Sequence, residues 1–191
     1  MDIFILIIAS YFAGSVPFGL ILTKIFLKKD VRDIGSGNIG ATNVLRTGNK
    51  FLALLTLILD VSKGYLLTKY VLTYSPEEIF IAGLVCFLGH IFPVWLKFKG
   101  GKGVAVYLGI VLGASFELAF VFGISWVIIL FIFKYSSLSS ILSSLILIFY
   151  NYFYSELFMI IFLVCSFMII LFTHRENILR IKEGKETKIK F

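Results

Sequence analysis

Glycines, hydrogen-bond donors and a guanidinium are concentrated between Asp33 and Arg46. Three glycines within six positions let backbone N–H groups turn toward an anion without obstruction by a Cβ atom. The candidate phosphate ligands of this first glycine segment are Gly35, Ser36, Gly37, Asn38, Thr42, Asn43 and Arg46. Asn38 and Thr42 are spaced i,i+4, so a helix beginning here would place both near its positive N-terminus. The alternative is a flexible polar loop, and no Walker A pattern is present.

A second glycine segment, Gly100-Gly101-Lys102-Gly103, directly precedes an apolar run. Gly101 and Gly103 offer backbone donors at the start of a predicted helix, and we expect Lys102 to contact an anionic ligand. Lys97 and Lys99 are interpreted as ordinary positive charges on the cytoplasmic side. His90, one turn before Pro93, is interpreted as a hydrogen-bonded structural histidine.

Two further polar segments follow Lys134 and Thr173. The serine cluster that begins at Ser136 can cap a helix or bind a ligand, and Ser137 and Ser140 are its candidate contacts. His174 and Asn177 are spaced i,i+3 and therefore share a helix face. His174 can serve as an acid, a base or a phosphate donor, with capping as the alternative.

The elements that carry these segments have the composition of an integral membrane protein. The chain has 191 residues, of which 59% are hydrophobic and 15% are charged, whereas soluble domains carry about 25% charged residues. Apolar runs long enough to cross a bilayer cover Ile3–Phe26, Phe51–Leu72, Glu78–Leu96 and Ser155–Phe172. We also predict a kink at Pro17 and a buried ion pair between Asp60 and Lys63.

The distribution of basic residues predicts the topology. Sixteen of the eighteen Lys and Arg residues lie in Lys24–Lys50, Lys97–Gly103, at Lys134 and after Phe172. Cytoplasmic connections carry such an excess. The pattern favours seven transmembrane helices, some short or broken, with the N-terminus outside and the C-terminus cytoplasmic. This count requires Val104–Phe133 to form two helices that turn at Glu117, since one helix would bury that carboxylate. We predict one domain, 1–191, with a short basic tail at about 176–191.

These segments together resemble the acyl-phosphate:glycerol-3-phosphate acyltransferase (PlsY) family. The resemblance runs over essentially the whole chain and is most specific in Gly-Ser-Gly-Asn-Ile-Gly-Ala-Thr-Asn-Val-Leu-Arg and Phe-Lys-Gly-Gly-Lys-Gly-Val-Ala. Lys134 stands where many members have arginine, which keeps the cation but loses a bidentate fork.

The resemblance implies a bacterial inner-membrane enzyme with its active site on the cytoplasmic face. Its substrates would be acyl-phosphate and glycerol-3-phosphate, and its products lysophosphatidic acid and inorganic phosphate. It implies no metal or cofactor, and we expect no nucleic acid and no obligate protein partner beside membrane lipid.

The residues give this chemistry a physical form. We expect Ser36, Arg46 and Lys102 to bind phosphate, and Asn38, Asn43, Ser137, Ser140 and Asn177 to orient the substrates. The hydroxyl proton is expected to pass to His174 or to a substrate phosphate. The alternatives are a lipid phosphatase, an acyltransferase with a thioester donor, and a transporter of phosphorylated metabolites.

Overall fold

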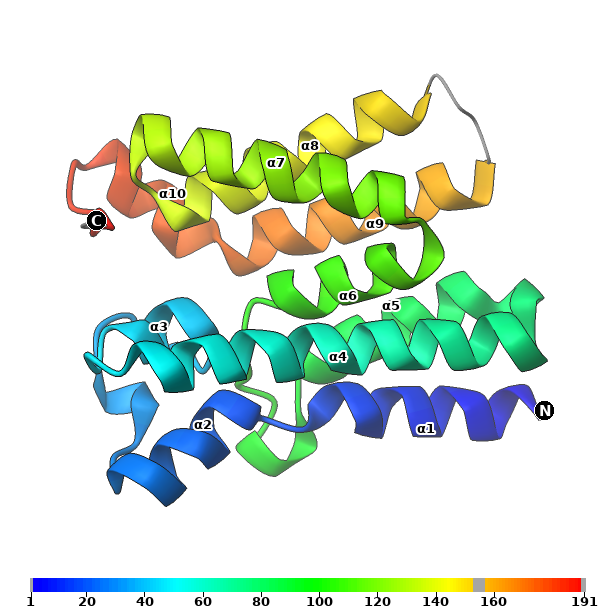
Figure 1. The fold of residues 1–191 in the computed structure, drawn as a ribbon, viewed down its shortest axis with the longest axis horizontal. Coiled ribbons are helices and arrows are strands. Elements are labelled where there is room, and N and C mark those ends of the chain that lie inside the picture. The colour runs from blue at the N-terminus through cyan, green and yellow to red at the C-terminus, as the bar shows by residue number, and fades with distance from the viewer. Residues whose placement is uncertain (1, 153–156, 190–191) are drawn as a thin grey trace. The chain divides into compact units, whose positions relative to one another are not determined.

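The computed structural model of this chain describes residues 2–152 and 157–189, and every regular element in these ranges is a helix. The chain forms two compact units, Met1–Ala114 and Ser115–Phe191, and each is described by itself below. Figure 1 labels the α-helices along the chain. The expectation of an all-helical protein is therefore confirmed in the described part of the chain.

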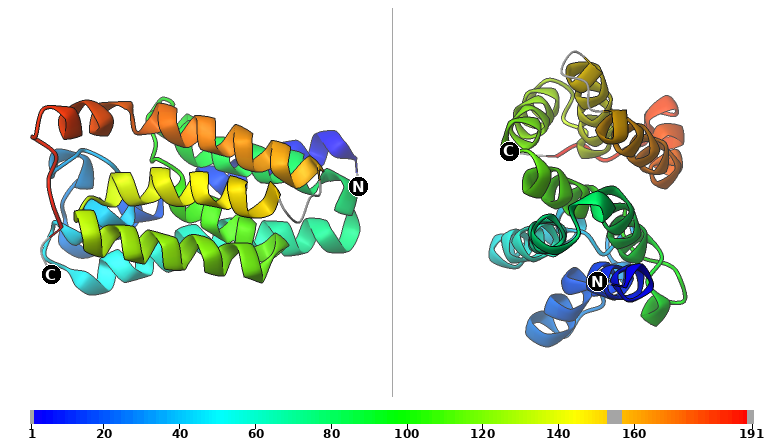
Figure 2. Two further views of the ribbon diagram at one scale, coloured as in Figure 1. Left: turned by 90° about the horizontal axis from the view of Figure 1, so that it is seen from above. Right: turned by 90° about the vertical axis from the view of Figure 1, so that its right-hand side faces the viewer.

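The first unit is built on four longer helices that pack in two pairs. Helix α1 lies along α5, and α4 lies along α6 (Figures 1 and 2). The helices of this unit are α1 (Ile3–Ser15), α2 (Phe18–Leu22), α3 (Ala41–Leu45), α4 (Lys50–Tyr74), α5 (Ile79–Ile91) and α6 (Val104–Ala114). A π-helix at Thr23–Leu27 and 3-10 turns at Val31–Asp33, Pro76–Glu78 and Val94–Leu96 connect them. The predicted kink at Pro17 is confirmed, because α1 and the segment that follows it are bent by 40°.

Glycines let these helices approach closely. A Cβ atom at Gly64 of α4 would lie 2.3 Å from the carbonyl oxygen of Val106 on α6. A Cβ at Gly109 of α6 would lie 2.0 Å from the carbonyl oxygen of Val61. Small residues at such contacts are typical of helices that pack by van der Waals contact in membranes. These two glycines fix the position of α6, and the second glycine segment immediately precedes that helix.

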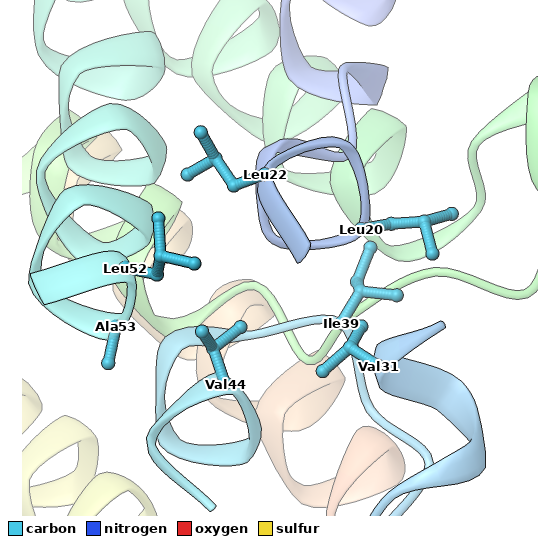
Figure 3. Packing of buried hydrophobic residues seen from close by; sticks show 7 residues of the cluster. All are labelled: Leu20, Leu22, Val31, Ile39, Val44, Leu52 and Ala53. Atoms are coloured by element: carbon cyan, nitrogen blue, oxygen red, sulfur yellow. The ribbon is translucent and has the colours of Figure 1, made fainter. Parts of the chain in front are cut away.

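An apolar cluster anchors the first glycine segment to the helices. Figure 3 shows its side chains, which come from α2, the 31–39 segment, α3 and the start of α4. The cluster consists of Leu20, Leu22, Val31, Ile39, Val44, Leu52 and Ala53. Val31 and Val44 are completely buried. Burial of a Val or Leu side chain stabilises by about 1.5–3 kcal/mol, so the glycine segment is fastened at both ends.

The second unit contains α7 (Phe116–Phe133), α8 (Ser136–Tyr152), α9 (Leu157–Thr173) and α10 (Arg175–Lys182). Helix α8 packs on both α7 and α9, and α10 contacts α8 and α9. The hydroxyls of Ser139, Ser140 and Ser144 each donate a hydrogen bond to the backbone carbonyl four residues earlier in the chain. These hydroxyls are thereby satisfied inside an apolar bundle.

The predicted division of Val104–Phe133 into two helices is confirmed, but the break lies at Ser115 and not at Glu117. The Ser115 hydroxyl accepts a hydrogen bond from the N–H of Leu118 and caps α7. Glu117 lies in the first turn of α7 and accepts a hydrogen bond from the hydroxyl of Tyr150. A serine is a preferred N-cap, which explains why the helix begins there.

Within residues 2–152 and 157–189, length and composition allow three helices to cross a membrane, or up to five when each bent pair counts as one span. Val104–Ala114 and Ser136–Tyr152 are apolar but shorter. Large apolar side chains such as Phe120 and Ile132 are more than half exposed, as expected for residues that face lipid. The seven-span count and the orientation of the termini stay predictions.

Candidate functional site

The first glycine segment is organised around the side chain of Asn43, which is 2% exposed. Its amide nitrogen donates to the carbonyl oxygens of Val31, Ile34 and Asn38 at 2.8–2.9 Å. Its Oδ1 accepts from the backbone N–H and the hydroxyl of Ser36, at 3.1 and 3.3 Å. Asn43 therefore holds the loop in shape, and direct contact of its amide with a substrate stays a prediction.

Arg46 lies over the same loop. A Cβ atom at Gly35 would lie 2.6 Å from Cδ and 2.8 Å from Nη1 of Arg46, and the positive φ of Gly35, 55°, also favours glycine. Arg46 is exposed and forms no ion pair within the described ranges. The loop thus places Gly35, which precedes Ser36, against the Arg46 side chain. Phosphate binding by Ser36 and Arg46 stays a prediction.

Two details of this segment differ from the prediction. Helix α3 begins at Ala41, so Asn38 precedes it and does not share a helix face with Thr42. Asn38 instead accepts a hydrogen bond from the N–H of Gly40 at 2.9 Å, which closes a tight turn before the helix. Thr42 lies half-buried in α3.

The second glycine segment is tied to the end of α5. The N–H of Gly100 donates to the carbonyl of Ile91, and that of Gly101 to the carbonyl of His90, at 2.9 and 3.1 Å. Gly103 has a φ of 79° and precedes α6. Lys102 is half-buried between these two glycines. The predicted placement of Lys102 directly before a helix is confirmed.

Backbone donors are fewer than the sequence suggested. The N–H of Gly37 donates to the carbonyl of Ile34, and the N–H of Gly101 donates to the carbonyl of His90. The N–H groups of Gly35 and Gly103 have no acceptor among the residues that the structure describes. Of the four glycines proposed as donors, these two therefore keep an N–H without an acceptor in that part of the chain; Gly35 is exposed and Gly103 is buried.

The two glycine segments meet at one surface hollow of about 500 Å³, here called the basic hollow. Its lining consists of Arg32, Gly37, Trp95, Leu96, Lys97, Lys99 and Gly100. Lys97 and Lys99 are exposed and have no acidic partner within the described ranges. Sequence reasoning treated them as topological charges and missed Arg32 and Trp95, since the meeting of these loops depends on the tertiary fold.

The third cation of the hollow is partly neutralised. Arg32 donates Nε and Nη2 to the two carboxylate oxygens of Asp30 at 2.9 and 2.7 Å. This side-chain bond, opposed by burial, holds the pKa of Asp30 well below its usual range, and Asp30 in turn raises the pKa of Arg32. The net positive charge of the hollow therefore comes mainly from Lys97 and Lys99.

In the second unit, His174 stands between α9 and α10 and is 3% exposed. Its Nδ1 lies 2.9 Å from the carbonyl oxygen of Ile170. A carbonyl only accepts hydrogen bonds, so Nδ1 carries the proton and Nε2 is the basic nitrogen. The bond to Ile170 fixes the orientation of the ring, and the role of His174 as a base stays a prediction.

Ser137 and Asn177 come together in the second unit, but both are held by Glu186 of the tail. The Glu186 Oε1 accepts from the Ser137 hydroxyl at 3.0 Å and from the Asn177 amide at 2.6 Å. Its Oε2 accepts from Nε of Arg180 at 2.8 Å. Burial acts to raise the pKa of Glu186, but the hydrogen bonds from Arg180, Asn177 and Ser137 together hold it below its ordinary value.

Glu186 was missed by sequence reasoning, which described residues 176–191 only as a short basic tail. The tail is helical to Lys182, and the N–H of Ile189 donates to the carbonyl of Lys134 at 2.8 Å. Ser140, also predicted to bind substrate, accepts from Nε1 of Trp126 at 3.0 Å and donates to Ser136. Its hydroxyl is therefore engaged in joining α7 to α8.

No group of three or more His, Cys, Asp or Glu side chains suited to a metal ion occurs in the part of the chain that the structure describes. The expectation that the reaction needs no metal or cofactor stays a prediction.

Comparison with known proteins gives a consistent result over the whole chain. The glycerol-3-phosphate acyltransferase family profile matches residues 4–184. A glycerol-3-phosphate acyltransferase of Pelagibacter ubique is 55% identical and covers 100% of this chain and 99% of its own length. One of Bartonella henselae is 49% identical, with 97% of this chain and 90% of that protein covered.

Solved structures agree with the sequence comparison. The crystal structure of PlsY, an integral membrane glycerol 3-phosphate acyltransferase, in its glycerol 3-phosphate form is 32% identical to this chain, with a TM-score of 0.92. The superposition covers 98% of this chain and 95% of the PlsY chain. The lysophosphatidic acid form of the same protein gives a TM-score of 0.89.

Proposed function

Since this chain belongs to the glycerol-3-phosphate acyltransferase family, we propose that its acyl donor is an acyl-phosphate and its products are lysophosphatidic acid and inorganic phosphate. The observation that carries this proposal is the meeting of two glycine segments at the basic hollow. A reaction between two phosphorylated substrates needs several cationic ligands. Arg32, Lys97 and Lys99 line the hollow, and we propose Arg46 and Lys102, one in each glycine segment, as further phosphate ligands.

The chemistry asks little of the protein beyond placement and charge stabilisation. The 1-hydroxyl oxygen of glycerol-3-phosphate attacks the acyl carbon and forms the ester C–O bond. The bond between that carbon and the phosphate oxygen breaks, and phosphate leaves with the electron pair. The hydroxyl proton passes to the His174 Nε2 or to a substrate phosphate oxygen. Fixed donors then stabilise the charge that develops on the carbonyl oxygen and the leaving phosphate.

The proposed roles follow the geometry within each unit. Arg46 and Lys102 bind phosphate, and Ser36 donates its hydroxyl beside Arg46. The N–H groups of Gly35 and Gly103 add backbone donors. In the second unit, His174 is the proposed base, while Ser137 and Asn177 orient substrate from positions fixed by Glu186. The proposed location is the bacterial inner membrane with the glycine segments cytoplasmic, which the alternating distribution of basic residues supports.

A donor comparison tests this assignment. Purified protein is given glycerol-3-phosphate with palmitoyl-phosphate or with palmitoyl-CoA, and lysophosphatidic acid is measured. We expect product from palmitoyl-phosphate only. Product from palmitoyl-CoA alone would show that the donor is a thioester.

A further inference from the structure

The first unit contains a buried lysine that the proposed chemistry does not use. Lys63 lies on α4 with a side chain 5% exposed, one turn after Asp60. Its Nζ donates to the carbonyl oxygens of Gly14 and Val16 at 3.1 and 3.0 Å and lies 3.0 Å from Nδ1 of His90. With Asp60, the three hydrogens of the ammonium are shared among four partners within 3.1 Å. Asp60 Oδ1, at 2.8 Å, supplies the neutralising charge.

The two carbonyls belong to the break in the first apolar run. Pro17 has no N–H, and the N–H of Phe18 turns back to the carbonyl of Val16 at 3.1 Å. The carbonyl of Gly14 therefore lacks the donor that a continuous helix would provide. Free backbone groups at membrane depth must be satisfied by neighbouring protein groups. Lys63 satisfies this one and fixes the break against α4.

The third partner connects this break to the second glycine segment. An ammonium only donates, so His90 Nδ1 accepts from Lys63 and its Nε2 carries the proton. The Nε2 side of the ring packs against Gly101, where a Cβ atom would lie 2.1 Å from Nε2. The backbone of His90 also accepts from the N–H of Gly101. The position of the His90 ring therefore sets the position of the backbone next to Lys102.

A separate hydrogen bond joins the same break to the basic hollow. Nε1 of Trp95 donates to the hydroxyl of Ser15 at 2.8 Å, and Trp95 lines the hollow. A shift of the break would therefore move the hollow from two sides, through Trp95 and through His90.

We propose that Lys63 is a positioning residue for the acyltransfer reaction, which holds the break at Pro17 and the His90–Gly101 contact in one arrangement and so places Lys102 for phosphate binding. The inference rests on the proposed function for the role of Lys102. It predicts that loss of Lys63 weakens substrate binding more than it slows turnover.

The test uses a variant that removes both charges. Lys63→Met alone leaves Asp60 buried and unpaired, which destabilises the fold by itself. Lys63→Met combined with Asp60→Asn removes that charge. Lys69→Met is the matched control, because Lys69 is an exposed lysine on the same helix. The readouts are the thermal midpoint, kcat, KM for each phosphorylated substrate, and amide hydrogen exchange over residues 97–106.

We expect the double variant to fold, to raise KM for at least one substrate about tenfold or more with a smaller change in kcat, and to exchange faster over 97–106. Lys69→Met should change none of these quantities. Unchanged KM and unchanged exchange in a folded double variant would overturn the proposal. Loss of folding in the double variant would do the same, because the cluster would then serve folding and not the loop. Hydrogen exchange needs no turnover, so it reports the order of residues 97–106 even if the wild type does not catalyse the proposed reaction.

Discussion

Replacement of Asn43 by alanine should disorganise the first glycine segment in the substrate-free protein. The change removes donors to three backbone carbonyls and the acceptor for two groups of Ser36. The side chain has two amide hydrogens and one carbonyl oxygen, so about three to four bonds are lost in a buried place. At about 1 kcal/mol net for each bond, the organised loop loses about 3–4 kcal/mol relative to open forms.

That magnitude converts into substrate affinity through the population of the organised loop. Apparent affinity falls in proportion to the competent fraction, and about 1.4 kcal/mol corresponds to a factor of ten. If the organised loop of the wild type is already more stable than its open forms, part of this free-energy loss leaves the organised form populated and does not reduce affinity. We therefore expect KM for a phosphorylated substrate to rise about 10- to 100-fold in Asn43→Ala.

The assay combines steady-state kinetics with hydrogen exchange at Ser36 and its neighbours without substrate. Asn49→Ala is the control, since Asn49 caps α4 through the N–H of Leu52 at 3.0 Å and has no bond to the glycine segment. It should cost about 1 kcal/mol of stability and leave KM unchanged. If folded Asn43→Ala kept the Ser36 amide as protected from hydrogen exchange as in wild type and had a KM within twofold of wild type, the reasoning would be refuted.

Three further predictions concern the other contacts. Glu186→Gln should lower the thermal midpoint at neutral pH. The folded-state pKa of Glu186 lies below its ordinary value of 4.5. The difference in midpoint between wild type and variant should therefore persist above pH 4.5 and shrink as the pH falls below it. Gly101→Ala should raise KM, because its Cβ would lie 2.1 Å from His90, whereas Gly123→Ala, with nothing within 4 Å, should leave KM unchanged. Arg46→Ala and Lys102→Ala should each lower kcat/KM at least 10²- to 10³-fold with intact membrane insertion; near-normal turnover in both would contradict the phosphate-site assignment.

Local signals in the sequence predicted the breaks and the loop chemistry. Pro17 marks the kink because it lacks an N–H, and the cost of a buried Glu117 required the division that the structure makes at Ser115. The composition of the glycine segment indicated an anion site. Its internal bonds were not predictable, because the partners of Asn43 depend on turns that bring residues 31, 34 and 38 around one side chain.

Long-range contacts were the part that sequence reasoning missed. Glu186 binds Ser137, which is 49 positions earlier, and no local pattern encodes that pairing. Glu186 carries no distinguishing local signal, since the mostly basic tail also contains Glu176 and Glu183. The Asp60–Lys63 pair was predicted from its spacing, but its attachment to Gly14, Val16 and His90 depends on how α1, α4 and α5 pack.

The most direct test of the proposed reaction is phosphate release from palmitoyl-phosphate by the purified protein, with and without glycerol-3-phosphate, in the presence of a chelator. We predict release only when glycerol-3-phosphate is present, with an equal amount of lysophosphatidic acid formed. Release without the acceptor would indicate a phosphatase, and no release under either condition would contradict the acyl-phosphate donor.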